Sequence, residues 1–104
     1  MVLNDLKEIM EDDFNELIRI FVSDGIEQIN ALDTAINLKN YTDTKRIAHT
    51  LKGSCANIGA FKLSQTCKQL EYMITEKSLA GVVELQKKIA LEFDETKKCL
   101  EDIL

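Results

Sequence analysis

An unbroken series of apolar residues, spaced three and four positions apart, most constrains the fold of this chain. The series consists of Phe14, Leu17, Ile18, Phe21, Gly25, Ile29, Leu32 and Ile36. This spacing places one apolar stripe along a helix and predicts a long helix that ends at about residue 38. Because the chain contains no proline, has only four glycines and shows no strand-like alternation, we predict an all-α fold.

The remaining apolar residues predict three further long helices. Asn40 is a suitable N-cap for a helix that runs to Ile58 and stops at Gly59, a residue that favours a left-handed C-terminal turn. Ser78 can cap the last helix, in which near-heptad spacing continues from residue 82 to residue 103. The helix between these two is predicted from Leu63, Cys67, Leu70 and Ile74.

Short connections between these helices favour antiparallel neighbours. We therefore predict an antiparallel up-down four-helix bundle, preceded by a short additional N-terminal helix carrying Leu3, Leu6 and Met10. The 104 residues contain no linker, low-complexity tract or repeat, so residues 1–104 are expected to form a single domain. Because one bundle closes its own core, we expect a monomer.

The charge balance limits the partners of the chain. Thirteen basic and eighteen acidic residues give a net charge of -5, which disfavours binding to nucleic acid or to an acidic membrane surface. No stretch has the roughly 20 apolar residues of a membrane span, and no basic-then-apolar leader opens the chain. We expect a cytoplasmic protein; Met1 and the compact length favour a free-standing protein, although a domain of a hybrid sensor kinase stays open.

The single histidine lies on the polar side of the second long helix. At about 100° per residue, His49 falls about 200° from Ile47 on the helical wheel. Lys52, Gly53 and Ala56 lie around it, so the imidazole has a cation one turn later and little side-chain bulk beside it. The expected inward stripe consists of Ile47, Leu51, Ser54, Cys55 and Ile58.

Gly53 is the residue of this face that most needs an explanation. A glycine in a helix interior costs roughly 0.5 to 1 kcal/mol relative to alanine, and no turn is needed at this position. Close approach of another surface is the usual reason for accepting that cost. An exposed histidine or lysine alone, by contrast, is common on any protein surface.

The run His49-Thr50-Leu51-Lys52-Gly53-Ser54, followed by Ala56, Ile58, Gly59 and Ala60, resembles the histidine-containing phosphotransfer domain of bacterial multistep phosphorelays. The resemblance implies that His49 is phosphorylated, that Lys52 lies beside the phosphoryl group, and that Gly53 leaves room for the partner's active site. It also implies that donor and acceptor are aspartates of response-regulator receiver domains, which bring Mg²⁺ and most of the catalytic groups.

Other chemistries fit the residues less well. Cys55, Cys67 and Cys99 are too widely spaced for a C-x-x-C metal site, and the first two fall on apolar stripes, so we predict core thiols and no metal site. A di-metal bundle would place Glu three residues before the histidine, where this chain has Arg46. No nucleophile or split carboxylate pair accompanies His49, so an independent enzyme is not expected.

Phosphoryl transfer through histidine needs fewer catalytic groups from the protein than these chemistries do. A neutral, exposed imidazole is a nucleophile without an activating base, and the loose transition state needs mainly positioning and neutralisation of charge. Lys52 is placed to offset phosphoryl charge. Because the chain has no nucleotide-binding loop and no Mg²⁺-holding cluster near His49, we expect a phosphoryl carrier without kinase activity and without a cofactor of its own.

Some relatives place Gln on the following helix, where it can hydrogen-bond the imidazole, whereas Glu71 occupies the matching position here. A carboxylate there would repel phosphate, so we expect Glu71 to face solvent or Lys68 rather than His49. The expected docking surface combines Gly53 and Ala56 with Val22 and Ile26 of the long helix. The alternative function is a non-phosphorylated helical adaptor that docks a receiver or kinase domain; His49 together with Lys52 and Gly53 argues against it.

Overall fold

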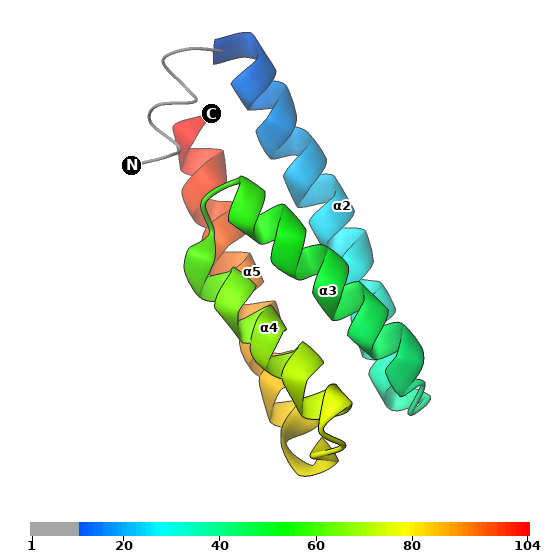
Figure 1. The fold of residues 1–104 in the computed structure, drawn as a ribbon. Coiled ribbons are helices and arrows are strands. Elements are labelled where there is room, and N and C mark those ends of the chain that lie inside the picture. The colour runs from blue at the N-terminus through cyan, green and yellow to red at the C-terminus, as the bar shows by residue number, and fades with distance from the viewer. Residues whose placement is uncertain (1–10) are drawn as a thin grey trace.

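The computed structural model describes residues 11–104, and the helix expected around Leu3, Leu6 and Met10 lies outside this range. Its elements are α2 (Glu11–Asn37), α3 (Tyr41–Asn57), α4 (Phe61–Thr75), the short 3-10 helix η1 (Leu79–Gly81) and α5 (Val82–Ile103). Successive α-helices run in opposite directions along one elongated bundle (Figure 1). The predicted all-α, up-down four-helix bundle is confirmed.

One residue in the left-handed backbone region follows each of the helices α2, α3 and α4. These residues are Lys39 (φ 55°), Gly59 (φ 84°) and Lys77 (φ 57°). The next backbone N–H in each case donates to a carbonyl five positions earlier: Asn40 to Ala35, Ala60 to Cys55 and Ser78 to Met73, at 2.8, 2.8 and 2.9 Å. This hydrogen bond closes the helix end and keeps the connections short. The predicted left-handed turn at Gly59 is confirmed.

The two predicted N-caps have different outcomes. Asn40 caps α3 as predicted, because its side-chain oxygen accepts a hydrogen bond from the backbone N–H of Asp43 at 3.1 Å. Ser78 does not cap α5: it precedes η1, makes no capping hydrogen bond, and α5 begins only at Val82. The prediction at Ser78 is wrong because a turn of 3-10 helix intervenes between that residue and the last helix.

The core runs the length of the bundle and explains the glycine in α2. Phe21 of α2 and Phe93 of α5 lie with ring centroids 6.0 Å apart. A Cβ on Gly25 would approach Phe93 Cζ to 2.5 Å, and Phe93 is buried. Gly25 is therefore required by the packing of its own chain. The fully buried residues of the core include Ile18, Leu51, Leu63, Leu70 and Ile89.

Two polar features lie within this core. Cys55 and Cys67 are free and buried as predicted, and the hydrogen bond with the Cys55 thiol together with burial raises the pKa of Cys67. Glu92 of α5 is also buried, and neither carboxylate oxygen has a hydrogen-bond partner. Its nearest cation is the Lys62 ammonium, 3.7 Å away.

Over residues 11–104, no helix is long and apolar enough to cross a membrane.

Candidate functional site

His49 stands on the outer face of α3, and 66% of its side chain is exposed. The opposite face of the helix is anchored in the core by Ile47, Ala48, Leu51 and Cys55, which are all buried. An imidazole on this face is accessible to a second protein, while the opposite face of α3 packs against the core. The exposure expected for the imidazole is observed.

The boundary of the buried face of α3 differs from the expectation at Ser54. Ser54 is exposed and lines a groove of about 190 Å³ between α2 and α3, so it does not belong to the inward stripe. Ala48 takes the inward place instead and is fully buried. The helix is therefore rotated slightly from the orientation that its large apolar residues alone suggest.

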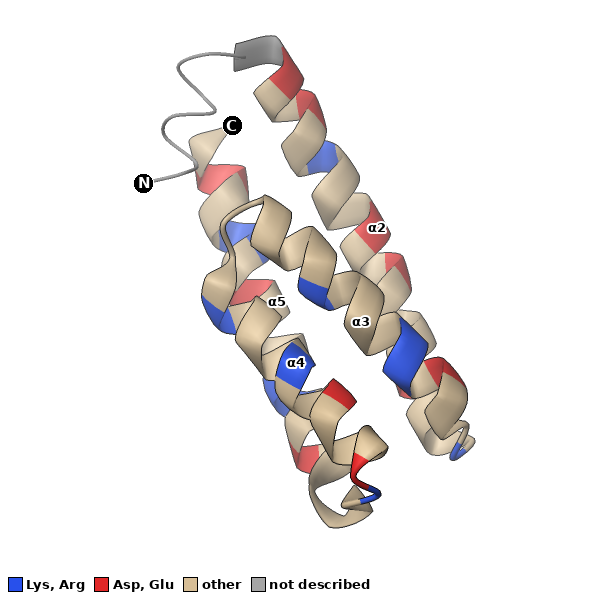
Figure 2. Ribbon diagram, viewed as in Figure 1, with Lys and Arg blue, Asp and Glu red and all other residues tan. Residues whose placement is uncertain are grey.

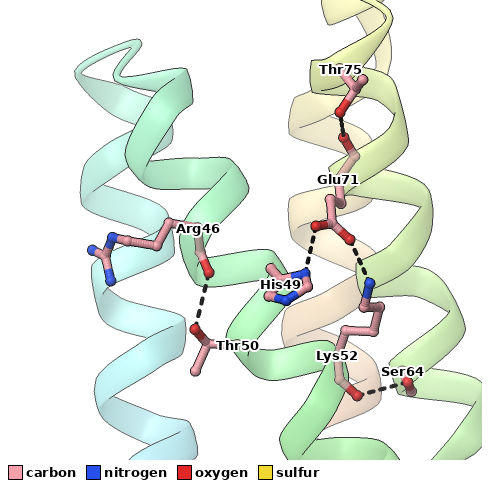
Figure 3. Close-up of polar contacts among 7 residues, drawn as sticks. All are labelled: Arg46, His49, Thr50, Lys52, Ser64, Glu71 and Thr75. Atoms are coloured by element: carbon pink, nitrogen blue, oxygen red, sulfur yellow. Dashed lines mark hydrogen bonds and ion pairs between the residues drawn. The ribbon is translucent and has the colours of Figure 1, made fainter.

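Glu71 of α4 joins the two polar side chains of α3 (Figure 3). Its Oε2 lies 2.7 Å from Nδ1 of His49, and its Oε1 accepts a hydrogen bond from Nζ of Lys52 at 2.8 Å. The expectation that Glu71 turns to solvent or to Lys68 is wrong. That expectation considered the carboxylate alone, whereas Lys52 shares its charge and makes a position beside the ring favourable.

The contact with Glu71 indicates which ring nitrogen of His49 carries the proton and which carries the lone pair. An ionised carboxylate can only accept hydrogen bonds, so Nδ1 is the nitrogen that carries the proton of the neutral ring. The lone pair is then on Nε2, at the other edge of the imidazole. Because the two nitrogens lie on different edges, the carboxylate does not occupy the position from which Nε2 would meet phosphorus.

The surroundings of the Glu71 carboxylate favour its ionised form. The hydrogen bond from Lys52, and after it the hydrogen bond from His49, hold the pKa of Glu71 below its usual value, although partial burial acts against them. The side chain of Glu71 is only 18% exposed, whereas that of Lys52 is 30% exposed. The arrangement therefore keeps a negative charge against Nδ1 and a positive charge near the ring.

Ser64 of α4 makes a further contact between the two helices near the site. Its hydroxyl donates a hydrogen bond to the backbone carbonyl of Lys52 at 2.8 Å (Figure 3). Neither this contact nor the Glu71 bridge was identified from the sequence. A pairing of residues 19 and 22 positions apart depends on the register between α3 and α4, which no local pattern reports.

Gly53 faces open space. A Cβ built on it would have no atom within 4 Å outside its own helix turn, in contrast to the crowded position of Gly25. Ala56, one turn along, is also exposed, and α3 carries no charged residue from Gly53 to Asn57 (Figure 2). Nothing among residues 11–104 requires a glycine at position 53, so the described part of the chain gives no internal reason for it.

Val22 and Ile26 do not lie beside this surface. The side of α2 that shares the groove with α3 carries Leu17, Ile20, Asp24 and Gln28. On the helical wheel Val22 and Ile26 fall roughly 170° away from these residues, and Val22 packs partly buried against the core. Their expected placement next to Gly53 and Ala56 is corrected, because α3 packs on the other flank of α2.

Comparison with known proteins agrees with this geometry. Residues 16–103 match the family model of the Hpt domain. The chain belongs to the Hpt domain family. Histidine-containing phosphotransfer protein 2 of Arabidopsis thaliana is similar to this Hpt domain, with 24% identity over 95% of the chain and 68% of the relative. Multistep phosphorelay regulator 1 of Schizosaccharomyces pombe is 30% identical over 88% of the chain, which spans only 32% of that relative.

A solved structure shows the same architecture for a related protein. The crystal structure of histidine-containing phosphotransfer protein B (HptB) from Pseudomonas aeruginosa PAO1 superposes with a TM-score of 0.92 at 30% identity. The match covers 97% of this chain and 88% of that chain. The resemblance noted in the sequence is thus confirmed: this Hpt domain is an intermediate of histidine phosphotransfer, a phosphoryl carrier rather than an enzyme.

Proposed function

We propose that Nε2 of His49 accepts a phosphoryl group from an aspartate of one receiver domain, or from a sensor kinase, and passes it to an aspartate of another receiver. The observation that carries this proposal is the contact of Nδ1 with Glu71 on a histidine whose side chain is 66% exposed, since this contact leaves the lone pair on Nε2. His49 is also the sole histidine of the chain. A histidine phosphotransfer intermediate needs such a nitrogen.

Beyond the histidine nucleophile, phosphoryl transfer needs few further groups from this chain. Phosphoryl transfer proceeds through a loose, in-line transition state, so positioning and charge neutralisation supply most of the catalysis. Lys52 contributes an ammonium near the ring and offsets part of the phosphoryl charge. The Mg²⁺ and the remaining catalytic groups are expected on the receiver domain, and this chain supplies neither kinase activity nor a cofactor.

The docking surface for the receiver is proposed to be the uncharged end of α3 with the neighbouring flank of α2. Gly53 and Ala56 offer a face with little side-chain bulk, which lets a partner's active site approach the backbone. Leu17 and Ile20 are 40% and 49% exposed and lie on the same side, along the groove shared with α3. Apolar side chains grouped in this way are typical of protein-binding surfaces.

The remaining properties follow from this function. We propose that residues 1–104 form one Hpt domain that acts as a monomer in the cytoplasm, with receiver domains, or a hybrid sensor kinase, as partners. A net charge of -5 does not favour nucleic acid or an anionic membrane surface as a further partner.

The test is transfer of label from a receiver domain phosphorylated with ³²P. The native chain should acquire label that is labile in acid and stable in base, as expected for a phosphoramidate. His49→Gln should acquire none while still binding the receiver. Label that persists in His49→Gln would remove His49 from its proposed role, and binding without any labelling of the native chain would favour the adaptor function.

A second variant separates loss of the nucleophile from loss of the fold. His49 is exposed, so His49→Gln should unfold at the temperature of the native chain within a few degrees. Thr42→Ala, at an exposed position in the first turn of the same helix and outside the proposed docking surface, serves as the matched surface control and should be labelled. Equal loss of label in both variants would point to damage of α3 rather than to the chemistry of His49.

A further inference from the structure

We propose that Lys45 and Arg46 select the receiver by charge: they pair with acidic side chains that border the phosphorylated aspartate, and so favour receivers whose surface beside the active site is acidic. The inference rests on the proposed function of His49 and goes beyond it, because it concerns the choice of partner. Both residues are exposed and lie on α3, one turn before the histidine.

The first argument is the position of the two cations on α3. On the helical wheel, Lys45 falls about 40° and Arg46 about 60° from His49, and residues three or four apart on a helix have Cβ atoms roughly 5 to 6 Å apart. Figure 3 shows the Arg46 side chain extending to the side of α3 on which α2 lies, whereas the imidazole extends toward α4. A standard interface buries about 800 Å² on each partner, so the area covered around His49 reaches roughly 16 Å from its centre. A receiver that reaches the imidazole therefore covers both cations.

The second argument is that the charges of Lys45 and Arg46 are available to a partner. Lys52, the third cation of α3, is bound to Glu71 at 2.8 Å. Nε of Arg46 lies 3.8 Å from Asp43, too far for a hydrogen bond, and this carboxylate already accepts a hydrogen bond from the side chain of the N-cap residue at 2.9 Å. Within residues 11–104, Lys45 forms no ion pair. Neither charge is balanced closely by the bundle itself.

The stability of α3 does not explain where these cations lie. Cations stabilise a helix in its last turn, but α3 has no basic residue there. The long α2 has seven acidic residues and one basic residue, whereas α3 has three basic residues and one acidic residue (Figure 2). In a chain with a net charge of -5, positive charge is thus concentrated around His49.

This local charge fits the chemistry of the proposed partner. A phosphorylated receiver presents phosphoryl oxygens and the carboxylates that hold Mg²⁺, which prefers such oxygen ligands. A chain of net charge -5 would repel that surface from a distance, and the cations beside His49 oppose this repulsion where phosphorus must arrive. Opposite charges across an interface accelerate association and fix the orientation of the partners. Lys45 and Arg46 therefore discriminate between receivers, whereas Gly53 and Ala56 only permit close approach.

A hydrated helix face without a partner is the competing explanation, and the salt dependence of transfer separates the two. The experiment replaces both cations, Lys45→Gln with Arg46→Gln, and uses the ³²P-labelled receiver that labels His49. At low receiver concentration and an ionic strength of about 0.01 M, where the Debye length is about 30 Å, the second-order rate constant should fall about tenfold. At about 1 M, where this length is about 3 Å, the native and variant chains should agree within about twofold. The rate constant at saturating receiver should also stay within about twofold, since the pair acts on docking and not on the ring.

Two control variants separate the position of the charge from its amount and from side-chain shape. Lys87→Gln with Lys88→Gln removes two adjacent, exposed cations from α5, which packs on α2 and α4 rather than on α3, and should keep the native rate within about twofold. Lys45→Arg with Arg46→Lys keeps the charge and should transfer at the native rate.

Three results would overturn the inference while leaving His49 as the acceptor. These are an unchanged rate constant in the Lys45 and Arg46 variant, an equal loss in the α5 variant, and a loss that persists at high salt or at saturating receiver. Label on His49→Gln would instead overturn the proposed function.

Discussion

Gly53→Ala should stabilise the isolated chain and slow its reaction with a receiver. A Cβ at this position meets no atom within 4 Å, so the substitution brings only the difference in helix propensity. That difference is about 0.5 to 1 kcal/mol in favour of alanine. For a domain of this size it corresponds to a rise in Tm of about 2 to 8 °C. The same methyl group projects from the face on which the receiver is proposed to dock.

Gly25→Ala is the matched control, because it makes the same change in the interior of another helix. Here the added Cβ would lie 2.5 Å from Cζ of the buried Phe93, so the ring or the helix must shift. Overpacking of this kind costs typically about 1 to 3 kcal/mol, which exceeds the gain in helix propensity. The two alanine variants should therefore change stability in opposite directions.

Urea and thermal unfolding measure the first effect, and the rate of phosphotransfer at low receiver concentration measures the second. We expect Gly53→Ala to unfold at higher urea concentration, and its second-order rate constant for transfer to fall by a factor of about ten or more, for roughly 1.4 kcal/mol of lost docking energy. A lower midpoint would show that the fold itself needs the glycine. A higher midpoint with an unchanged transfer rate would refute the argument that a partner accounts for Gly53.

Three further predictions concern the polar groups within and between the helices. Glu92→Met should raise the free energy of unfolding by about 1 kcal/mol, because it removes a buried carboxylate that lacks hydrogen bonds and is only loosely paired with Lys62; a lower urea midpoint would contradict this. Ser64→Ala should lower that free energy by about 1 kcal/mol through loss of the hydrogen bond to the Lys52 carbonyl, and an unchanged midpoint would show that the contact adds nothing. The pKa of Glu71 is lowered, chiefly by Lys52, so its contribution to stability is complete above the ordinary carboxyl pKa of about 4.3 and is lost as the pH falls through the lower folded value. The stability difference between the native chain and Glu71→Gln should accordingly shrink in acid, whereas a difference independent of pH would argue against the ion pair.

The elements that local sequence determines were predictable. The long α2 follows from the spacing of its apolar residues, Asn40 caps α3 through its own side chain, and Gly59 closes it with a left-handed turn. His49 is exposed because the apolar residues of α3 lie on the other side of the helix. Each of these features depends on residues within one or two turns of one another, which a sequence pattern reports directly.

The features that depend on how helices meet were not predictable in the same way. The helical wheel of α2 shows two flanks but does not say on which of them α3 packs. The flank with Val22 and Ile26 is therefore the wrong prediction, and Leu17 and Ile20 line the groove with α3 instead. The exact rotation of α3 decides whether Ser54 or Ala48 is buried, and neighbouring helices set that rotation.

The environment of the histidine was misjudged for a related reason. Glu71 reaches the ring only because the register of α4 against α3 brings the carboxylate between His49 and Lys52. Considered with the histidine alone, a carboxylate should repel an incoming phosphoryl group. With the ammonium included, and with the contact made at Nδ1 rather than Nε2, the charges are compatible. Electrostatic predictions at such a site therefore need every charged group that the fold brings together.

The most direct test of the account is the identity of the nitrogen that bears phosphorus. The chain has one histidine, so labelling of histidine with ¹⁵N gives the ring signals of His49 alone. After incubation with a phosphorylated receiver, we expect coupling between ³¹P and Nε2, while Nδ1 keeps its proton beside Glu71. Coupling to Nδ1, or a ring spectrum that stays unchanged while phosphate is incorporated elsewhere in the chain, would contradict the account.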